Sequence, residues 1–221
     1  MNGKISSDDL LGQEFFARDA LDVAYDLLGK FLRHESVIMR ISEVEAYRFP
    51  HDSANHCRMG RTPRNDVMWG VGGHTYIYLC YGMHQMLNIV TGGEGEGEAV
   101  LIRSCEPVAD LETIGARRGG KRGPVTLTGP GKVSQALGLD ASFNALPLFE
   151  RGGLEIIGGP KPAGVLVGPR VGIDYATKKD RNAKWRIGLA ESVWVSHAKG
   201  LKPPHQRNEH WQKWRSRPKT T

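Results

Sequence analysis

The stretch from Val37 to Tyr47, which reads VIMRISEVEAY, consists mainly of apolar residues and contains neither glycine nor proline. This composition predicts a β-strand. Because successive side chains of a strand point to opposite faces, Glu43, Glu45 and Tyr47 should share one face. Residues 30–34 have the same character and are separated from the stretch by a short polar segment. We therefore expect two adjacent strands joined by a turn.

Further elements follow on both sides of this pair. Strands are expected over residues 74–80, 86–91, 99–104, 154–157 and 170–173, and helices over residues 20–28, 111–118 and 133–137. Asp19 is in position to cap the first helix, and Gly29 to end it. The connections between strands resemble hairpins and not regular βαβ units, so the pattern predicts a mixed α and β protein with antiparallel pairing.

Charge is unevenly distributed along the chain. The segment from Lys199 to the end holds seven Lys and Arg against one Glu, a balance equal to the net charge of +6 of all 221 residues. A second basic cluster, Arg117, Arg118, Lys121 and Arg122, lies in a glycine-rich segment. Localised basic segments indicate a polyanionic partner, although a solvated tail remains the alternative for the last segment. Trp211 and Trp214 argue against an inert tail, because tryptophan is rare in disordered segments.

The composition makes several other classes of protein improbable. No apolar run approaches the ~18 residues of a membrane-spanning helix, and the first residues lack the apolar core of a secretion signal. The three cysteines, Cys57, Cys80 and Cys105, are widely spaced and include no CxxC motif. We therefore expect neither a disulfide framework nor a cysteine-rich zinc site, and a reducing cytoplasmic setting.

Glu45 is the first candidate for chemistry. A carboxylate among apolar strand residues can have a raised proton affinity and serve as a general base, whereas the plain alternative is an exposed glutamate on an edge strand. The same reasoning applies to Glu43. Two carboxylates on one face would also suit sugar hydrolysis, or metal binding together with His51 and His56, although their spacing matches no standard ligand pattern.

An aromatic hairpin is the second candidate. Tyr76, Tyr78 and Cys80 should face one way along the strand, which is more often a core pattern than a binding pattern. Tyr81 is different, because the neighbouring Gly82 marks the tip of a turn, where a large ring cannot easily reach the core. Rings in such positions insert between base pairs or stack on bases. Basic edges, an aromatic wedge and a buried carboxylate together indicate an enzyme that flips a base out of DNA.

Eight tracts in the same order resemble the 3-methyladenine DNA glycosylase family, of which mammalian alkyladenine DNA glycosylase is typical. They are Glu43–Tyr47, His56, Arg61–Asn65, Tyr76–Met83 with Asn88, Val100–Arg103 before Glu106-Pro107, Gly129–Lys132 before Gln135-Ala136-Leu137, Arg170–Ile173 and Trp194–Ser196. The resemblance spans residues 10–198. It implies an α+β fold of one domain over residues 1–198, built around a curved antiparallel sheet with flanking helices and a protruding hairpin. Residues 199–221 would form a basic C-terminal tail.

The resemblance also implies roles for individual residues. Glu45 matches the general base, and Arg103 an arginine that helps to hold the water and the adjoining phosphate. Tyr47, His56 and Tyr78 match residues that enclose the flipped base, and Asn88 one that rejects guanine. Tyr81 matches the wedge that fills the vacated stack. The residues expected to contact DNA are Tyr81, Arg61, Arg64, Met83, His84 and Lys132. The pattern alone also allows Lys132 to bind a phosphate, because it follows glycines at the start of a helix, although an ordinary turn is the more common meaning of such a segment.

Three positions depart from the family pattern. His84 stands where the mammalian enzyme has a further aromatic residue, the loop from Gly92 to Glu98 is longer and more acidic, and Asp174 replaces a glycine near the expected pocket wall. The first departure suggests different local DNA contacts. The third puts the breadth of lesion preference in question.

The expected activity is hydrolysis of the N-glycosidic bond of alkylated or deaminated purines, such as 3-methyladenine, hypoxanthine and ethenoadenine, in double-stranded DNA. Aromatic faces should attract a cationic base such as 3-methyladenine. No lysine lies between Ile41 and Asn88, so no Schiff base is expected. We expect a monofunctional, monomeric enzyme without a metal or cofactor and without membrane contact, either cytoplasmic beside a bacterial nucleoid or nuclear. The alternatives are a non-catalytic damage-binding module and a hydrolase of small sugars or nucleosides.

Overall fold

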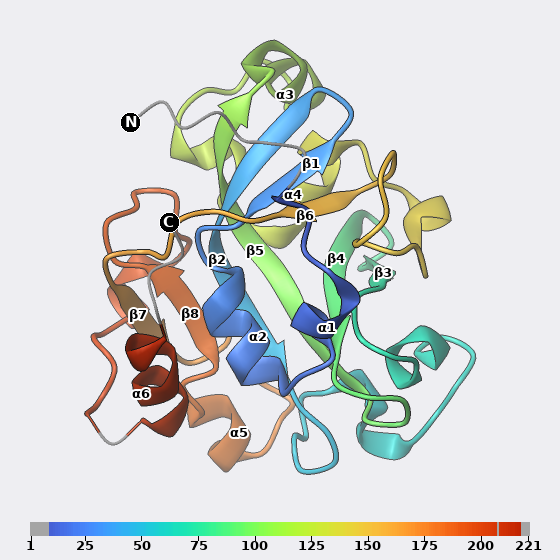
Figure 1. The fold of residues 1–221 in the computed structure, drawn as a ribbon, viewed down its shortest axis with the longest axis vertical. Helices are drawn as coiled ribbons and strands as arrows, with labels where there is room; N and C mark the ends of the chain where they lie inside the picture. The colour runs from blue at the N-terminus through green and yellow to red at the C-terminus, as the bar shows by residue number, and fades with distance from the viewer. Residues whose placement is uncertain (1–8, 207, 218–221) are drawn as a thin grey trace.

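The computed structural model describes residues 9–206 and 208–217, and its centre is an antiparallel sheet (Figure 1). Along its main path the strands follow the order β3-β4-β5-β2-β1-β6, and β8 pairs with both β2 and β7. The strands are β1 (Phe31–His34), β2 (Val37–Tyr47), β3 (Thr75–Cys80), β4 (His84–Thr91), β5 (Glu98–Ala109), β6 (Glu155–Ile157), β7 (Val165–Gly168) and β8 (Arg186–Leu189). The predicted fold class is confirmed.

The opening stretch of the sequence is the strand β2, which lies at the centre of the sheet. β5 pairs along nearly its whole length, with register shifts on either side of Glu43. Such bulges bend a strand and increase its twist. On the other edge, the first residues of β2 pair with β1, and Glu43 to Glu45 pair with β8. The bend therefore lets two short strands share one edge of β2, and it gives the sheet its curvature.

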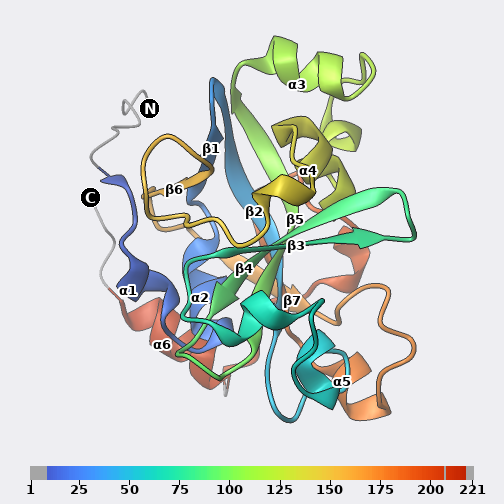
Figure 2. The same ribbon diagram turned by 90° about the vertical axis from the view of Figure 1, so that its right-hand side faces the viewer.

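β3 and β4 form a hairpin that extends away from the body of the molecule (Figure 2). At its tip Tyr81 and Gly82 have φ values of 51° and 68°, and the amide of Met83 donates to the carbonyl of Cys80 over 3.1 Å. Positive φ at both central residues is typical of the tight turns that suit twisted hairpins. The side chains of Tyr81 and Met83 are 86% and 71% exposed, so the predicted exposed tip is confirmed.

Six α-helices are present in the described part of the chain. They are α1 (Gln13–Phe16), α2 (Ala20–Leu27), α3 (Leu111–Arg117), α4 (Pro130–Leu137), α5 (Lys178–Asn182) and α6 (Glu209–Ser216). Asp19 caps α2 by accepting from the amides of Leu21 and Asp22, as predicted. α4 packs on β4 and β5. It begins at Pro130 and not at Val133, because proline at the first helical position loses no hydrogen bond.

The predicted strand over residues 170–173 is wrong. These residues form a loop, because Arg170 and the amide of Val171 bond to side chains elsewhere and not to a neighbouring strand. The strands β7 and β8 were not predicted, since each has four residues and contains a glycine.

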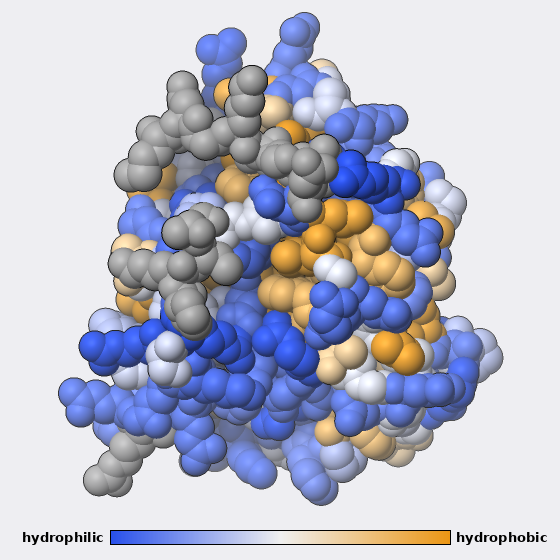
Figure 3. Space-filling model, in the orientation of Figure 1, coloured by the Kyte–Doolittle hydropathy of each residue, from blue (hydrophilic) through white to orange (hydrophobic). Residues whose placement is uncertain are grey.

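The described part of the C-terminal segment is folded onto the body. α6 packs against α2, where Lys213 and His210 contact the buried carboxylate of Asp22, and Trp214 is buried. The expected division at residue 198 stays a prediction. The face that carries α2 is mostly hydrophilic, apart from an apolar area between α1 and β6 (Figure 3). Among the described helices, none has the length and apolar character needed to cross a membrane.

Candidate active site

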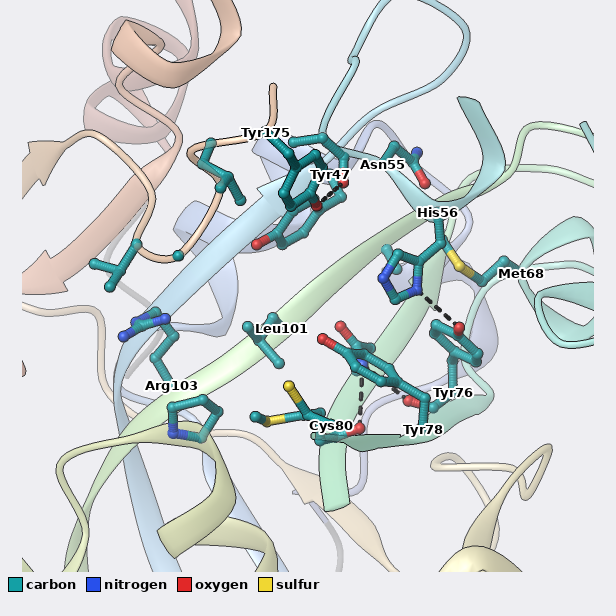
Figure 4. A pocket seen from close by; sticks show the side chains of 18 of the residues that line it. Tyr47, Asn55, His56, Met68, Tyr76, Tyr78, Cys80, Leu101, Arg103 and Tyr175 are labelled. Atoms are coloured by element: carbon teal, nitrogen blue, oxygen red, sulfur yellow. Dashed lines mark hydrogen bonds between the residues drawn. The ribbon is translucent and has the colours of Figure 1, made fainter. Parts of the chain in front are cut away.

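A cavity of about 170 Å³ opens between the β3–β4 hairpin, the end of β2 and the loop that follows β7 (Figure 4). Alternation along β5 sends Leu101 and Arg103 into its wall, while Val100 and Ile102 join the main core. The remaining wall comes from Tyr47, Ala54, Asn55, His56, Met68, Tyr76, Tyr78, Cys80, Tyr81, Met86, Asn88, Ala99, Pro130, Val171, Gly172, Ile173 and Tyr175. A closed apolar cavity of about 150 Å³ holds one benzene ring, so this open one has the scale of a flat heterocycle.

Aromatic rings form two sides of the cavity. Tyr47 and Tyr175 lie on one side, and His56 with Tyr78 on the other (Figure 4). The rings of His56 and Tyr78 are 4.7 Å apart between centroids, and His56 Nδ1 is 2.9 Å from the Tyr76 hydroxyl. The predicted alternation of Tyr76, Tyr78 and Cys80 is correct, because all three line the cavity. A planar ring can therefore be held between opposed aromatic faces.

Glu45 lies directly behind this wall and is fully buried. Its carboxylate accepts from the Tyr47 hydroxyl over 2.9 Å and from the amide of Val171 over 2.8 Å, and it lies 3.3 Å from Arg103 Nη1. All three of these partners line the cavity. Glu45 is therefore not an exposed edge residue, and its three partners lie between it and the cavity.

Glu43 and Arg186 complete a buried network of charges. Glu43 is fully buried and accepts from Ser104, Ser196 and Arg186 at distances of 2.7 to 3.0 Å. Arg103 lies between the two carboxylates, with its Nε 3.5 Å from Glu43. Burial lowers the pKa of Arg103, but the two glutamates outweigh it and raise the pKa above its ordinary value. Two carboxylates and two guanidinium groups thus balance each other, which limits the cost of burying them.

Arg103 does not use all of its donors within this network. Its Nη2 donates to the hydroxyl of Ser196 over 3.3 Å, and within the described residues its buried Nε has no hydrogen-bond partner. Unpartnered buried donors are costly and often mark functional positions. Of the two guanidinium groups in the network, Arg103 is the one that lines the cavity.

The titratable residues of the wall are held in defined protonation states. Burial, with help from Arg64 and Arg58, lowers the pKa of His56 to about 4, so the imidazole is neutral at physiological pH. Burial and the charge of Glu45 raise the pKa of the Tyr47 hydroxyl well above its ordinary value. Tyr47 consequently stays protonated and acts as a donor to Glu45.

Asn88 is 4% exposed and lines the cavity. Its Nδ2 donates to the carbonyls of Tyr76 and Met86 over 3.0 and 3.2 Å, which fixes the orientation of the amide. Asp174 is exposed and does not line the cavity, although its neighbours Ile173 and Tyr175 do.

Several residues expected to contact DNA lie around the hairpin. Tyr81 lines the outer part of the cavity and is exposed at the tip beside Met83. The side chain of His84 lies close to Gly131, where an added Cβ would come within 2.9 Å of the His84 Cβ. The hairpin thus rests on the first turn of α4, which also carries Lys132.

The two arginines before β3 are placed differently from each other. Arg64 lies at the cavity, with its guanidinium 5.4 Å from the centroid of the Tyr78 ring. Arg61 is exposed and forms an ion pair of 2.5 Å with Asp66. The structure thus brings Arg64 close to a ring of the cavity wall, although neither arginine lines the cavity itself.

Sequence reasoning missed several residues that support the site. Arg170 and Asp52 form a fully buried pair beside Tyr47, and Arg186 neutralises Glu43. Their partners are 118 and 143 residues away in the chain, so no local pattern could identify the pairs. Among the described residues, no group of three or more His, Cys, Asp or Glu side chains is arranged to hold a metal ion.

Comparisons with known proteins agree with this geometry. The model of the methylpurine-DNA glycosylase family matches residues 14–193. A Nitrosococcus oceani protein, provisionally named a 3-methyladenine DNA glycosylase, is 57% identical over 198 residues, covering 90% of this chain and 98% of its own. The DNA-3-methyladenine glycosylase of Arabidopsis thaliana is 57% identical over 197 residues, covering 88% of this chain and 77% of its own.

A more distant relative, from Carboxydothermus hydrogenoformans, has the same provisional name and is 43% identical over 193 residues, covering 85% of this chain and 98% of its own. The resemblance noted in the sequence is confirmed, because the family model spans most of the chain. The chain therefore belongs to the methylpurine-DNA glycosylase family, and it is a hydrolytic DNA N-glycosylase of the DNA-3-methyladenine type that acts in DNA repair.

Proposed function

We propose that this enzyme acts as a monomer on double-stranded DNA and removes both cationic and neutral damaged purines, including 3-methyladenine, hypoxanthine and ethenoadenine. The observation that carries the proposal is an aromatic cavity with the buried carboxylate of Glu45 immediately behind its wall. Stacking surfaces accept flat bases of either charge, and a carboxylate beside them can activate water.

Capture begins at the hairpin. The exposed side chains of Tyr81 and Met83 are suited to enter the base stack, because they lie at the tip of the hairpin. Tyr81 also borders the cavity. Turning a nucleotide out of the duplex costs a few kcal/mol, and less where damage has already weakened pairing. The flipped base then lies between Tyr47 on one side and His56 with Tyr78 on the other, above Asn88.

Bond cleavage uses Glu45 and Arg103. A water molecule held between them gives a proton to Glu45 as its oxygen attacks the anomeric carbon of the sugar. The N-glycosidic bond breaks, and the base leaves with the bonding electron pair. The negative charge of Glu45 also stabilises the cationic character that develops on the sugar. The position of Arg103 supports this role, because it lines the cavity, and Glu43 keeps its bonds to Arg186 and Ser196 when Arg103 contacts water or phosphate.

Whether the departing base must be protonated depends on its charge. A cationic base departs as a neutral molecule, whereas a neutral base must gain a proton. Neutral His56 can donate a hydrogen bond to the leaving base: if Nδ1 accepts from the Tyr76 hydroxyl, Nε2–H is the donor, and the proton that the base gains comes from solvent. No lysine lies between Ile41 and Asn88, which supports a monofunctional reaction that ends with an abasic site.

Single-turnover excision from matched duplexes tests the proposal. Each duplex carries 3-methyladenine, hypoxanthine, ethenoadenine or 7-methylguanine at one position, and free inosine and an undamaged duplex are controls. We expect release of each damaged base and no release from the controls. Tight binding without release would support a damage-binding module instead, and faster hydrolysis of free inosine would support a nucleoside hydrolase.

A further inference from the structure

Arg170 occupies an unusual position behind the cavity. Its guanidinium lies 4.6 Å from the centroid of the Tyr47 ring and 4.9 Å from that of Trp185, so it is close to both rings. Its side chain is fully buried and does not line the cavity. The charge therefore lies next to the Tyr47 ring but outside the cavity that Tyr47 lines.

The position of this guanidinium is fixed by several bonds. Nη1 and Nη2 donate to the carboxylate of Asp52 over 2.5 and 2.7 Å, and Nη1 also donates to the carbonyl of Ala46. A planar, bidentate pair of this kind is rigid as well as strong. Tyr47 is thus held at two points, by Arg170 against its ring and by Glu45 at its hydroxyl.

Two more rings of the cavity have a guanidinium close by. Arg64 lies 5.4 Å from the Tyr78 ring, and Arg58 lies 5.5 Å from the Tyr175 ring. Neither arginine lines the cavity. Both are exposed, so solvent and salt weaken their effect, whereas the buried Arg170 is screened much less. Three of the aromatic wall residues therefore have a cation nearby that lies outside the cavity.

A guanidinium group close to an aromatic ring changes the electrostatic potential at the face of that ring. The face of an aromatic ring carries negative potential, which attracts cations, and a guanidinium behind the ring reduces that potential at the opposite face. The cavity then gains less from a positively charged base, and more from a neutral base that becomes electron-rich as its bond breaks. Arg170 acts on Tyr47 in this electrostatic sense, since it lowers the pKa of the hydroxyl against the effects of burial and Glu45.

We propose that Arg170, held by Asp52, is a positioning and specificity-determining residue: it fixes the Tyr47 ring and biases excision toward neutral purines over cationic ones. This proposal rests on the proposed action on both classes of lesion. It replaces the expectation that the aromatic walls favour a cationic base, because that expectation considered the rings without their neighbours.

The test is the ratio of single-turnover excision rates for 7-methylguanine, which is cationic, and hypoxanthine, which is neutral, in the same duplex. The double variant Arg170→Met, Asp52→Asn removes the guanidinium without changing net charge. The ratio should rise about fivefold relative to the wild type, which corresponds to about 1 kcal/mol at 1.4 kcal/mol per tenfold change. Arg170→Lys keeps the charge, so its ratio should stay within about twofold of the wild type.

A second variant tests the same electrostatic effect in case the double variant does not fold. Arg64→Met changes an exposed side chain and should raise the ratio by about twofold at low salt, with a smaller effect at high salt. Arg215→Met is the matched control, because Arg215 lies 5.2 Å from the ring of Trp211 on α6, and neither residue lines the cavity. Its ratio should equal that of the wild type.

The outcomes separate the two proposals. If the wild type releases both bases but the ratio stays constant in the double variant and in Arg64→Met, the assignment of Arg170 is overturned, and an equal loss on every lesion would mean a purely structural role. If the wild type releases no neutral base, the proposed function itself fails. The pair of 3-methyladenine and ethenoadenine provides a second, independent ratio.

Discussion

The Tyr47 hydroxyl offers a sharp test of how the buried carboxylate is controlled. It donates to Glu45 over 2.9 Å; Glu45 is fully buried, and Tyr47 lines the cavity. Hydrogen bonds to charged groups contribute about 1.5–3 kcal/mol. If the bond keeps Glu45 aligned in the transition state, Tyr47→Phe should lower the excision rate by about 10- to 150-fold, at 1.36 kcal/mol per tenfold.

The same change should reduce stability but preserve DNA binding. One oxygen of Glu45 loses its donor, and an unsatisfied buried acceptor costs about 1–3 kcal/mol. For a chain of this size the melting temperature should then fall by about 2–12 °C. Binding to duplexes that contain a lesion should change little, because the ring of phenylalanine still stacks on the base and against Arg170.

The assay is single-turnover release of hypoxanthine, measured with binding of the same duplex and a thermal melt. Tyr25→Phe is the matched control: it removes a buried hydroxyl that accepts from Asn208 over 3.2 Å, and Tyr25 does not line the cavity. It should alter the melting temperature but not the rate. A Tyr47→Phe rate within threefold of the wild type would refute the idea that this hydroxyl aligns Glu45.

Two further predictions concern the hairpin tip and the core. Tyr81→Ala should weaken capture of lesions in duplex DNA more than in single strands, because only the duplex has a stack to fill, and equal binding losses on both substrates would argue against a wedge. Burial raises the pKa of Glu98 from 4.5 to about 7, so the stability that this group contributes is present below about pH 4.5 and is lost as the pH rises through 7. At pH 8 the free energy of unfolding of Glu98→Gln should therefore be higher than that of the wild type by up to about 3 kcal/mol, since each unit of pKa shift corresponds to 1.36 kcal/mol. Near pH 4.5 the two proteins should be equally stable. Urea unfolding at the two pH values measures this difference, and equal curves at pH 8 would contradict it.

Local chemistry accounts for the parts of the fold that the sequence predicted. The strand from Val37 to Tyr47, the cap at Asp19 and the exposed tip at Tyr81 each depend on neighbouring residues. The placement of Tyr76 and Tyr78 in one wall follows from alternation along a strand.

The missed features depend on residues far apart in the chain. Arg170 lies in a loop whose role comes from Asp52 and Tyr47, and Arg186 acts through Glu43, which no periodicity could reveal. The short strands β7 and β8 are stabilised by pairing with each other and with β2, and their own sequences are too short to identify them. The charge environment of the cavity therefore emerges only from the folded structure.

Excision by the Glu45→Gln variant tests the central claim most directly. Glutamine has nearly the same shape. Its single carbonyl oxygen can still accept from the Val171 amide, and its NH2 group can donate to the Tyr47 hydroxyl, but it cannot take a proton from water. We expect binding to hypoxanthine-containing duplex close to that of the wild type and base release reduced by at least about 100-fold, as for loss of a general base. Release at the wild-type rate by this variant would contradict the account.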